Sequence, residues 1–221
     1  MAQSGQRYDL IVFDWDGTIM DSTGLIADSI QLAAREMRLP VPTLEQAKSI
    51  IGLGINDSTR RLFPQLDASA QTRFALTYRK YFVARDHEAP LYDGIRELLS
   101  SLASPQRFLA VATGKPRAGL ERAFGHTGLK SHFHYSRCGD EGFPKPHPDM
   151  LRRLMDFSAV EPDRTLMIGD TTHDLELAQN AGVDALAVTY GAHPRAALAG
   201  LPARDIVDSV DELSRWIRTN A

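Results

Sequence analysis

Apolar and polar positions along this chain form two alternating patterns. Short apolar runs typical of buried strands are followed by stretches in which apolar residues recur at helical spacing. We predict strands at Tyr8–Phe13, Phe108–Ala112, Phe133–Ser136, Thr165–Ile168, Ala185–Val188 and, as an edge strand, Ile206–Val207. Helical patterns lie at Gly94–Leu102, Pro116–Phe124, Pro148–Phe157, Asp174–Ala181 and Val210–Ile217. This alternation predicts an α/β fold with a doubly wound, mostly parallel sheet that is covered by helices on both faces.

One stretch breaks the alternation. From residue 21 to residue 89 the patterns are helical throughout. Because the strand pattern resumes only afterwards, we predict an α/β core formed by residues 1–21 and 91–221 and an inserted all-helical domain at residues 22–90. An aromatic stripe runs along one of these helices, and we predict that it belongs to a core, since the basic residues beside it form no patch that would bind nucleic acid. The stripe consists of Phe74, Tyr78, Tyr81 and Phe82.

Composition narrows the function classes. The chain has 221 residues, 43% of them hydrophobic, and a net charge of −3, so no basic field attracts nucleic acid or an anionic membrane. Its single cysteine, Cys138, excludes an internal disulfide framework. The N-terminal residues lack a signal-peptide pattern, and no apolar run is long enough to span a membrane. We therefore expect a cytoplasmic protein, a monomer or a homodimer, without nucleic-acid or membrane partners.

Candidate chemistry begins where the first predicted strand ends. Asp14 and Asp16 follow its apolar run, and Gly17 comes directly after them. Carboxylates at the end of a strand lie where open α/β sheets bind ligands, and a glycine lets the backbone turn tightly or approach a ligand. An acidic turn that merely ends the strand is the alternative, because Asp and Gly are common in turns.

Polar residues also follow two later strands. Thr113 and Gly114 end one of them, and Asp170 follows another, with Asp174 four residues further on. Because parallel strands end at the same edge of a sheet, we expect all these residues to converge on one crevice. The hydroxyl of Thr113, the uncovered amide of Gly114 and the helix that begins at Pro116 suit a phosphate group.

Two lysines are candidates for a cation that binds this phosphate, and an ordinary surface lysine beside prolines is the alternative for Lys145. Lys145 lies between Pro144 and Pro146, whose rings stiffen the backbone on either side of it. Lys115 competes for the role because it is close to Thr113 in the sequence. We favour Lys145, since a rigid loop loses less entropy in holding one side-chain position.

Four carboxylates in one crevice repel one another and call for a cation. Asp14, Asp16, Asp170 and Asp174 offer only oxygen ligands, without a cysteine partner, and such a set favours Mg²⁺. For Asp174, a role as a helix cap is an equally good interpretation. We expect His173, which lies between the last two aspartates, to face solvent.

Taken together, these motifs resemble those of the haloacid dehalogenase superfamily. They occur in the same order as in that family and extend over nearly the whole chain. The helical insertion is similar to the family's small cap, and the chain is most similar to the phosphoglycolate phosphatase-like branch. The motifs are Asp14-x-Asp16-Gly17-Thr18, a strand ending in Thr113, Lys145 before a proline, and Gly169-Asp170-x-x-x-Asp174.

The resemblance implies a phosphoric monoester hydrolase. Asp14 would attack phosphorus and form an aspartyl-phosphate, and Asp16 would act as a general acid and then as a general base. Thr113 and Lys145 would hold the phosphoryl oxygens. For Mg²⁺, the resemblance implies the ligands Asp14, the backbone carbonyl of Asp16, and Asp170, with Asp174 as a direct or indirect ligand.

Other interpretations remain open at this point. Asp16 argues against the dehalogenases and phosphonate hydrolases of the superfamily, which lack an aspartate there. Thr18 favours a hydrolase over a sugar phosphomutase, which often has valine at that position. A receiver-like signalling module phosphorylated on Asp14 is a candidate of another class, but it would leave the helical insertion without a purpose.

Substrate choice is expected to come from the helical insertion. Gly52-Leu53-Gly54 resembles a mobile loop, and Arg60 or Arg61 could reach a carboxylate or a second phosphate. A solvated pair of arginines is an equally good interpretation. We expect a small phosphorylated metabolite as the substrate, with 2-phosphoglycolate as the leading candidate and a sugar phosphate or a nucleoside monophosphate as the alternatives.

Overall fold

A computed structural model describes residues 7–221 and contains one parallel sheet. Its six strands lie in the order β3-β2-β1-β4-β5-β6, and each neighbouring pair is parallel. This arrangement confirms the predicted α/β fold. The strands are β1 (Leu10–Phe13), β2 (Phe108–Thr113), β3 (Tyr135–Cys138), β4 (Thr165–Gly169), β5 (Asp184–Val188) and β6 (Ile206–Val207).

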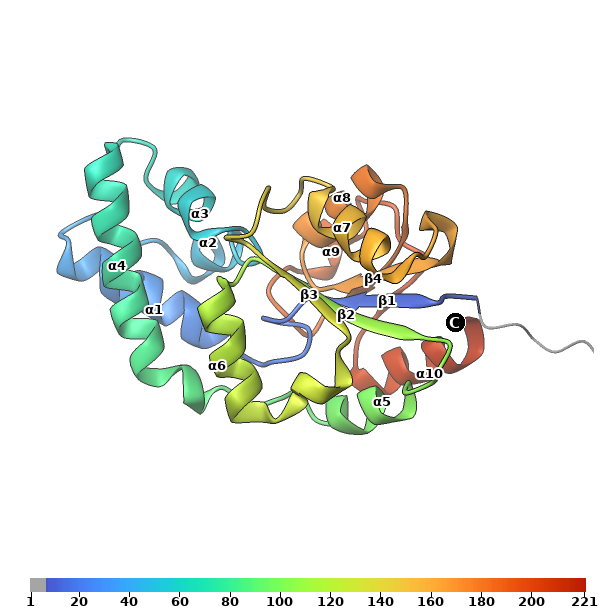
Figure 1. The fold of residues 1–221 in the computed structure, drawn as a ribbon. Helices are drawn as coiled ribbons and strands as arrows, with labels where there is room; N and C mark the ends of the chain where they lie inside the picture. The colour runs from blue at the N-terminus through green and yellow to red at the C-terminus, as the bar shows by residue number, and fades with distance from the viewer. Residues whose placement is uncertain (1–6) are drawn as a thin grey trace, which may run out of the picture.

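Helices cover both faces of the sheet, as its unbroken apolar strands require (Figure 1). Ile11 and Phe13 of β1 pack into one core, to which α5, α6 and α10 contribute. Leu10 and Val12, which point to the opposite face, pack into a second core with α7, α8 and α9. These helices are α5 (Ile95–Ser101), α6 (Arg117–Thr127), α7 (Asp149–Ser158), α8 (Thr172–Ala181), α9 (Arg195–Leu198) and α10 (Val210–Asn220).

The helices between β1 and α5 gather beyond the carboxyl ends of the strands (Figure 1). They enclose a third apolar core, in which the rings of Phe63 and Phe74 lie 4.8 Å apart between centroids. The block consists of α1 (Thr23–Glu36), α2 (Leu44–Lys48), α3 (Ile55–Leu62), α4 (Ala68–Arg85) and the short 3₁₀-helix η1 (Asp86–Glu88). No helix within residues 7–221 combines the length and the apolar character needed to cross a membrane.

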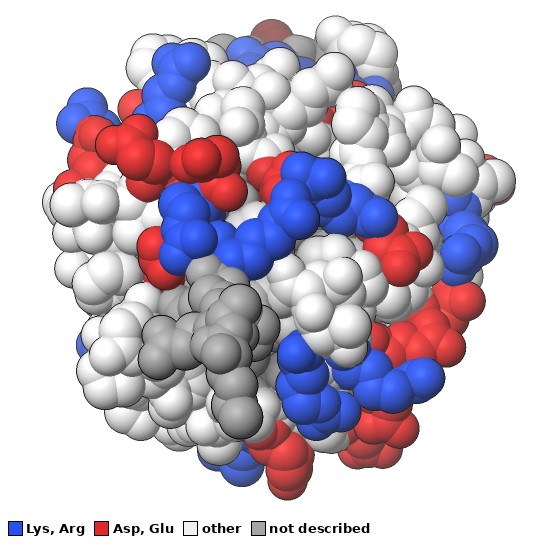
Figure 2. Space-filling model, turned by 90° about the vertical axis from the view of Figure 1, so that its right-hand side faces the viewer, with Lys and Arg blue, Asp and Glu red and all other residues white. Residues whose placement is uncertain are grey.

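At the opposite end of the sheet, charged side chains are engaged in ion pairs. Arg164 donates two hydrogen bonds of 2.8 Å to Asp9, and Arg204 lies 2.8 Å from Asp184. Basic and acidic side chains accordingly alternate over this face of the molecule (Figure 2). The side chains with candidate chemistry lie at the other end, beneath the helical block.

The first turn after β1 depends on a glycine. Gly17 has a φ of +90°, and a Cβ atom at this position would lie 2.2 Å from Oδ2 of Asp170. An L-residue would therefore be strained in its backbone and would also push the Asp170 carboxylate away. The tight turn thus lets the segment after β1 lie directly against the end of β4.

Replacing Gly17 with alanine is expected to lower the free energy of unfolding by about 2 kcal/mol or more, through strain and through displacement of Asp170. Gly125→Ala is the matched control, because Gly125 lies within α6 and its Cβ would meet nothing within 4 Å. That variant should gain up to about 1 kcal/mol from helix propensity. Urea denaturation measures both, and equal stabilities for the two variants would contradict the assignment.

Candidate active site

A cluster of buried carboxylates lies where β1 and β4 end. Asp14 follows β1, Asp170 follows β4, and Asp174 lies in the first turn of α8. All three are fully buried, and one oxygen of each lies within 4.8 Å of the other two. The adjacent parallel strands β1 and β4 therefore bring together residues that are far apart in the sequence.

Hydrogen bonds fix the orientation of two of these carboxylates. Asp170 accepts from the hydroxyl of Thr18 at 2.8 Å and from the amide of Ala192 at 2.7 Å. Oδ2 of Asp174 accepts from the amide and the hydroxyl of Thr171, at 3.0 and 2.7 Å. Asp174 thus caps its helix and also belongs to the cluster, which joins the two roles that the sequence left open.

One oxygen in the cluster lacks a partner. Oδ2 of Asp14 is buried and accepts no hydrogen bond within the described part of the chain. A buried carboxylate oxygen left in this way costs free energy, which a ligand at this position would recover. The three carboxylates supply hard oxygen donors of the kind that bind Mg²⁺ or Ca²⁺, so these residues fit a divalent cation.

Lys145 supplies a positive charge to the cluster. Its Nζ lies 2.7 Å from Oδ1 of Asp14 and 2.6 Å from Oδ1 of Asp174, and its side chain is fully buried. The lysine comes from the loop between Pro144 and Pro146, and its peptide bond to Pro146 is cis. Lys145 therefore holds one oxygen of Asp14 and leaves the other free.

The pKa values of the two aspartates in the cluster are raised first by burial and then by the neighbouring carboxylates. Burial raises the pKa of Asp14 well above its ordinary value, although Lys145 opposes the shift. The pKa of Asp170 rises to about 7, through burial and the neighbouring Asp174. Burial alone would lower the pKa of Lys145, but Asp14 and Asp174 raise it, so the ammonium stays charged. One ammonium among three carboxylates leaves a site that attracts a further cation.

Asp16 lies outside this cluster and faces a cavity beneath the helical block. Its Oδ1 accepts a hydrogen bond of 2.6 Å from Ser22 and lies 3.0 Å from Nζ of Lys115. The same Nζ lies 4.6 Å from the centroid of the Phe82 ring. The two lysines that competed in the sequence therefore have different partners: Lys145 pairs with Asp14, and Lys115 pairs with Asp16.

Thr113 and Gly114 line the same cavity as Asp14 and Asp16. The hydroxyl of Thr113 accepts a hydrogen bond of 3.1 Å from the amide of Lys115, which fixes the turn after β2. A Cβ atom on Gly114 would lie 2.5 Å from the carbonyl oxygen of Gly52 in the helical block. Gly114 therefore lets the loop between α2 and α3 lie directly on the sheet edge.

The described lining of this cavity does not include Arg60 or Arg61. Arg60 pairs with Asp57, and both arginines line a separate groove with Pro144 and Lys145. Gly54 lies at the same place, where its Cβ would be 3.5 Å from Pro144. A substrate-binding role for these three cap residues stays a prediction.

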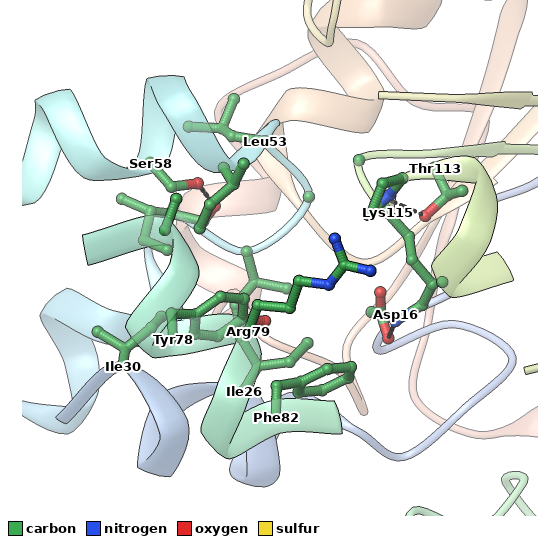
Figure 3. Close-up of a pocket in the computed structure, with 18 of the residues that line it drawn as sticks. Asp16, Ile26, Ile30, Leu53, Ser58, Tyr78, Arg79, Phe82, Thr113 and Lys115 are labelled. Carbon is green, nitrogen blue, oxygen red and sulfur yellow. Dashed lines mark hydrogen bonds and ion pairs between the residues drawn. The ribbon is translucent and has the colours of Figure 1, made fainter. Parts of the chain in front are cut away.

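An arginine that the sequence analysis missed lies at the cavity instead. Arg79 extends from α4 toward Asp16 and Lys115 (Figure 3). Its place in the sequence, directly after Tyr78 and three residues before Phe82 of the aromatic stripe, was the feature that could have identified it. The stripe itself proved to be more than core, because both of these rings line the cavity as well as packing in the helical block.

The sequence of this chain matches a known protein family over most of its length. A family model described as haloacid dehalogenase-like hydrolase matches residues 11–188, which include the whole carboxylate cluster and Lys145. The chain belongs to this family. The predicted membership in the haloacid dehalogenase superfamily is therefore confirmed.

Individual relatives of this haloacid dehalogenase-like hydrolase carry phosphatase names. It is 32% identical to the probable phosphatase IndB of Dickeya dadantii over 213 residues, which cover 92% of this chain and 91% of that protein. It is 27% identical to a phosphoglycolate phosphatase of Vibrio vulnificus over 94% of the chain and 95% of the relative. The crystal structure of a predicted phosphatase from Clostridium acetobutylicum superposes with a TM-score of 0.86 at 30% identity, covering 96% of this chain and 99% of that one. The predicted enzyme class, a phosphoric monoester hydrolase, is confirmed by these comparisons.

The solvent exposure of one histidine in this hydrolase differs from the prediction. His173 was expected to face solvent, but it is 4% exposed, and its Nε2 lies 3.2 Å from the carbonyl oxygen of Ser49 in the helical block. Burial lowers its pKa to about 4. The solvent-facing prediction was wrong because the helical block covers α8 at this point, and sequence spacing alone does not show which surfaces such a block covers.

Replacing Lys145 with methionine should destabilise this hydrolase strongly, because it leaves the buried carboxylates without their counter-charge. We expect a loss of about 3 kcal/mol or more in the free energy of unfolding in the presence of EDTA. Lys130→Met removes an exposed ion pair with Glu121 and should cost less than about 1 kcal/mol. Urea denaturation at neutral pH compares the two, and a Lys145 variant as stable as the Lys130 variant would show that the buried pairs contribute little.

Proposed function

We propose that this hydrolase is a Mg²⁺-dependent phosphatase that hydrolyses a small phosphate monoester through an aspartyl-phosphate on Asp14. The observation that carries the proposal is the unpartnered Oδ2 of Asp14, at the centre of a charged cluster and at the floor of a cavity. This oxygen is available to attack a phosphorus atom. The other oxygen is held by Lys145, so the carboxylate keeps one orientation.

The carboxylates of Asp14 and Asp170, the backbone carbonyl of Asp16 and, directly or indirectly, Asp174 would hold Mg²⁺. Bound there, the ion supplies positive charge that offsets the repulsion between the phosphoryl group and the carboxylates. Thr18 and Ala192 keep both oxygens of Asp170 in place by hydrogen bonds. The ligands are thus positioned before any ion binds.

In the first chemical step, Oδ2 of Asp14 attacks phosphorus, and the bond from phosphorus to the leaving oxygen breaks. The Thr113 hydroxyl, the Gly114 amide and the Lys145 ammonium bind the phosphoryl oxygens. These groups contribute by holding the substrate in place and by stabilising negative charge, which dominate in phosphoryl transfer. Residues 22–90 act as a cap that covers the reacting groups.

Asp16 moves the protons of both steps. Its carboxyl group gives a proton to the leaving oxygen, which departs as an alcohol. The resulting carboxylate then takes a proton from a water molecule, whose oxygen attacks phosphorus and releases Asp14 and inorganic phosphate. Ser22 and Lys115 both contact Oδ1 of Asp16, so Oδ2 is the oxygen that is left to carry the proton.

For the substrate, 2-phosphoglycolate is the candidate that the name of the Vibrio vulnificus relative supports. The charged floor of the cavity suits the phosphoryl group of any such ester. The alcohol portion is selected by the helical cap.

Asp14→Asn is expected to reduce Mg²⁺-dependent release of phosphate from p-nitrophenyl phosphate by at least about a thousandfold, since an amide is a poor nucleophile. EDTA should abolish the activity of the unchanged protein, and added Mg²⁺ should restore it. Asp156→Asn, on the exposed side of α7, is the control. Substantial turnover by the Asp14 variant, with its fold intact, would refute the assignment of the nucleophile.

Asp16→Asn should separate substrates by their leaving groups. Hydrolysis of ethyl phosphate should fall by about a hundredfold or more, because its alkoxide needs a proton. Hydrolysis of p-nitrophenyl phosphate should fall much less, since its phenolate leaves unprotonated. Equal losses of kcat on both esters would contradict a general-acid role.

Substitution of each arginine of the cap can be compared by the change that it causes in the KM for a carboxylated substrate. Arg79→Gln should raise the KM for 2-phosphoglycolate by about tenfold, through loss of a charge-assisted hydrogen bond. Alanine at Arg60 or Arg61 should raise the same KM if the sequence-based prediction holds. An effect confined to Arg60 and Arg61 would show that the cap closes differently when a substrate is bound.

A further inference from the structure

The cavity above Asp14 and Asp16 has an unusual lining for a site that binds a small anion. It has a volume of about 330 Å³, or room for on the order of ten water molecules at about 30 Å³ each. Its other charged residues lie on the core side, whereas the cap side is aliphatic and aromatic apart from Arg79 (Figure 3). The apolar lining includes Ile26, Ile30, Ile50, Leu53, Tyr78 and Phe82.

Two rings form the wall of the cavity along α4. Tyr78 and Phe82 are stacked, with centroids 5.7 Å apart and planes inclined by 20°. Lys115 lies over the Phe82 ring and connects this wall to Asp16. The aromatic surface therefore begins directly beside the group that would protonate the leaving oxygen.

Two polar groups in the cavity are without partners. Within residues 7–221, neither the Tyr78 hydroxyl nor the Arg79 guanidinium makes a hydrogen bond or an ion pair. Tyr78, Arg79 and Asp16 all line this cavity. Both groups are free to bind oxygen atoms of a ligand.

A short, fully polar alcohol such as glycolate would not use this lining. Its carboxylate could pair with Arg79, but most of the apolar wall would remain in contact with water. An alcohol that carries a ring would cover that wall and expel the water. Removing apolar surface from contact with water lowers the free energy of the complex.

We propose that the leaving alcohol of the natural substrate carries a planar, largely apolar ring that packs against Tyr78 and Phe82, while Arg79 binds an oxygen of the same alcohol. This inference rests on the proposed phosphatase function for the orientation of the ester. It assigns substrate selection to α4 rather than to Arg60 and Arg61.

Binding of non-hydrolysable phosphonates tests the proposal without requiring turnover. Calorimetry in the presence of Mg²⁺ should show benzylphosphonate binding at least tenfold more tightly than ethylphosphonate, because the ring adds buried apolar and aromatic contact. The ratio of kcat/KM for benzyl phosphate over ethyl phosphate should show the same preference. The alcohols of these two esters have similar acidity, so the ratio reports the contact with the ring.

Matched variants of α4 locate the effect. Tyr78→Ala should reduce the benzyl preference by about tenfold, whereas Tyr81→Ala should retain it, because Tyr81 contacts Glu36 and is outside the described lining of the cavity. Arg79→Gln should weaken binding of 4-carboxybenzylphosphonate or of 2-phosphoglycolate more than Arg73→Gln does, since Arg73 contacts Ser69 at the surface of the same helix.

These experiments distinguish failure of the ring-binding inference from failure of the proposed phosphatase function. Absence of Mg²⁺-dependent hydrolysis of every ester would refute the phosphatase mechanism, and the phosphonate preference would still test the pocket. Equal affinity for the two phosphonates, or a preference that Tyr78→Ala leaves unchanged, would overturn the inference. Efficient hydrolysis of 2-phosphoglycolate alone, with no benzyl preference, would also overturn it and would support the smaller substrate.

Discussion

The site depends on charges that are held out of water. Asp14, Asp170 and Asp174 are fully buried, and the single ammonium of Lys145 cannot balance them. Burying like charges costs free energy that the fold must supply from its two sheet cores. In the proposed mechanism, carboxylates held in this way need little reorganisation when a cation and a phosphoryl group bind, which is the condition for electrostatic catalysis.

Sheet topology explains why this cluster forms at β1. This strand lies between β2 and β4, so its carboxyl end is adjacent to Thr113 on one side and to Asp170 on the other. The chain then leaves this end to build the helical block before it returns to β2. A receiver-like module would not need such an excursion, whereas an enzyme with a covered site does.

Much of this arrangement could be predicted from the sequence, because strand ends follow from apolar runs and parallel strands end together. Asp14 and Asp170 lie at one edge for that reason, whereas Lys145, which pairs with Asp14 there, was favoured because of the prolines on either side of it. The contacts between cap and core could not be predicted, since they depend on how helices pack across a long insertion. Arg60 and Arg61 were named as candidates while Arg79 was overlooked, and His173 was expected at the surface, because sequence spacing does not show which helix face meets the sheet.

The close backbone contact between Gly114 and Gly52 limits which substitutions this protein can accept. Here the helical block and the sheet edge touch through bare polypeptide backbone, since a Cβ on Gly114 would lie 2.5 Å from the carbonyl oxygen of Gly52. Any larger residue at position 114 would act as a wedge between the two parts. This seam therefore restricts position 114 to glycine, whatever side chains line the cavity beside it.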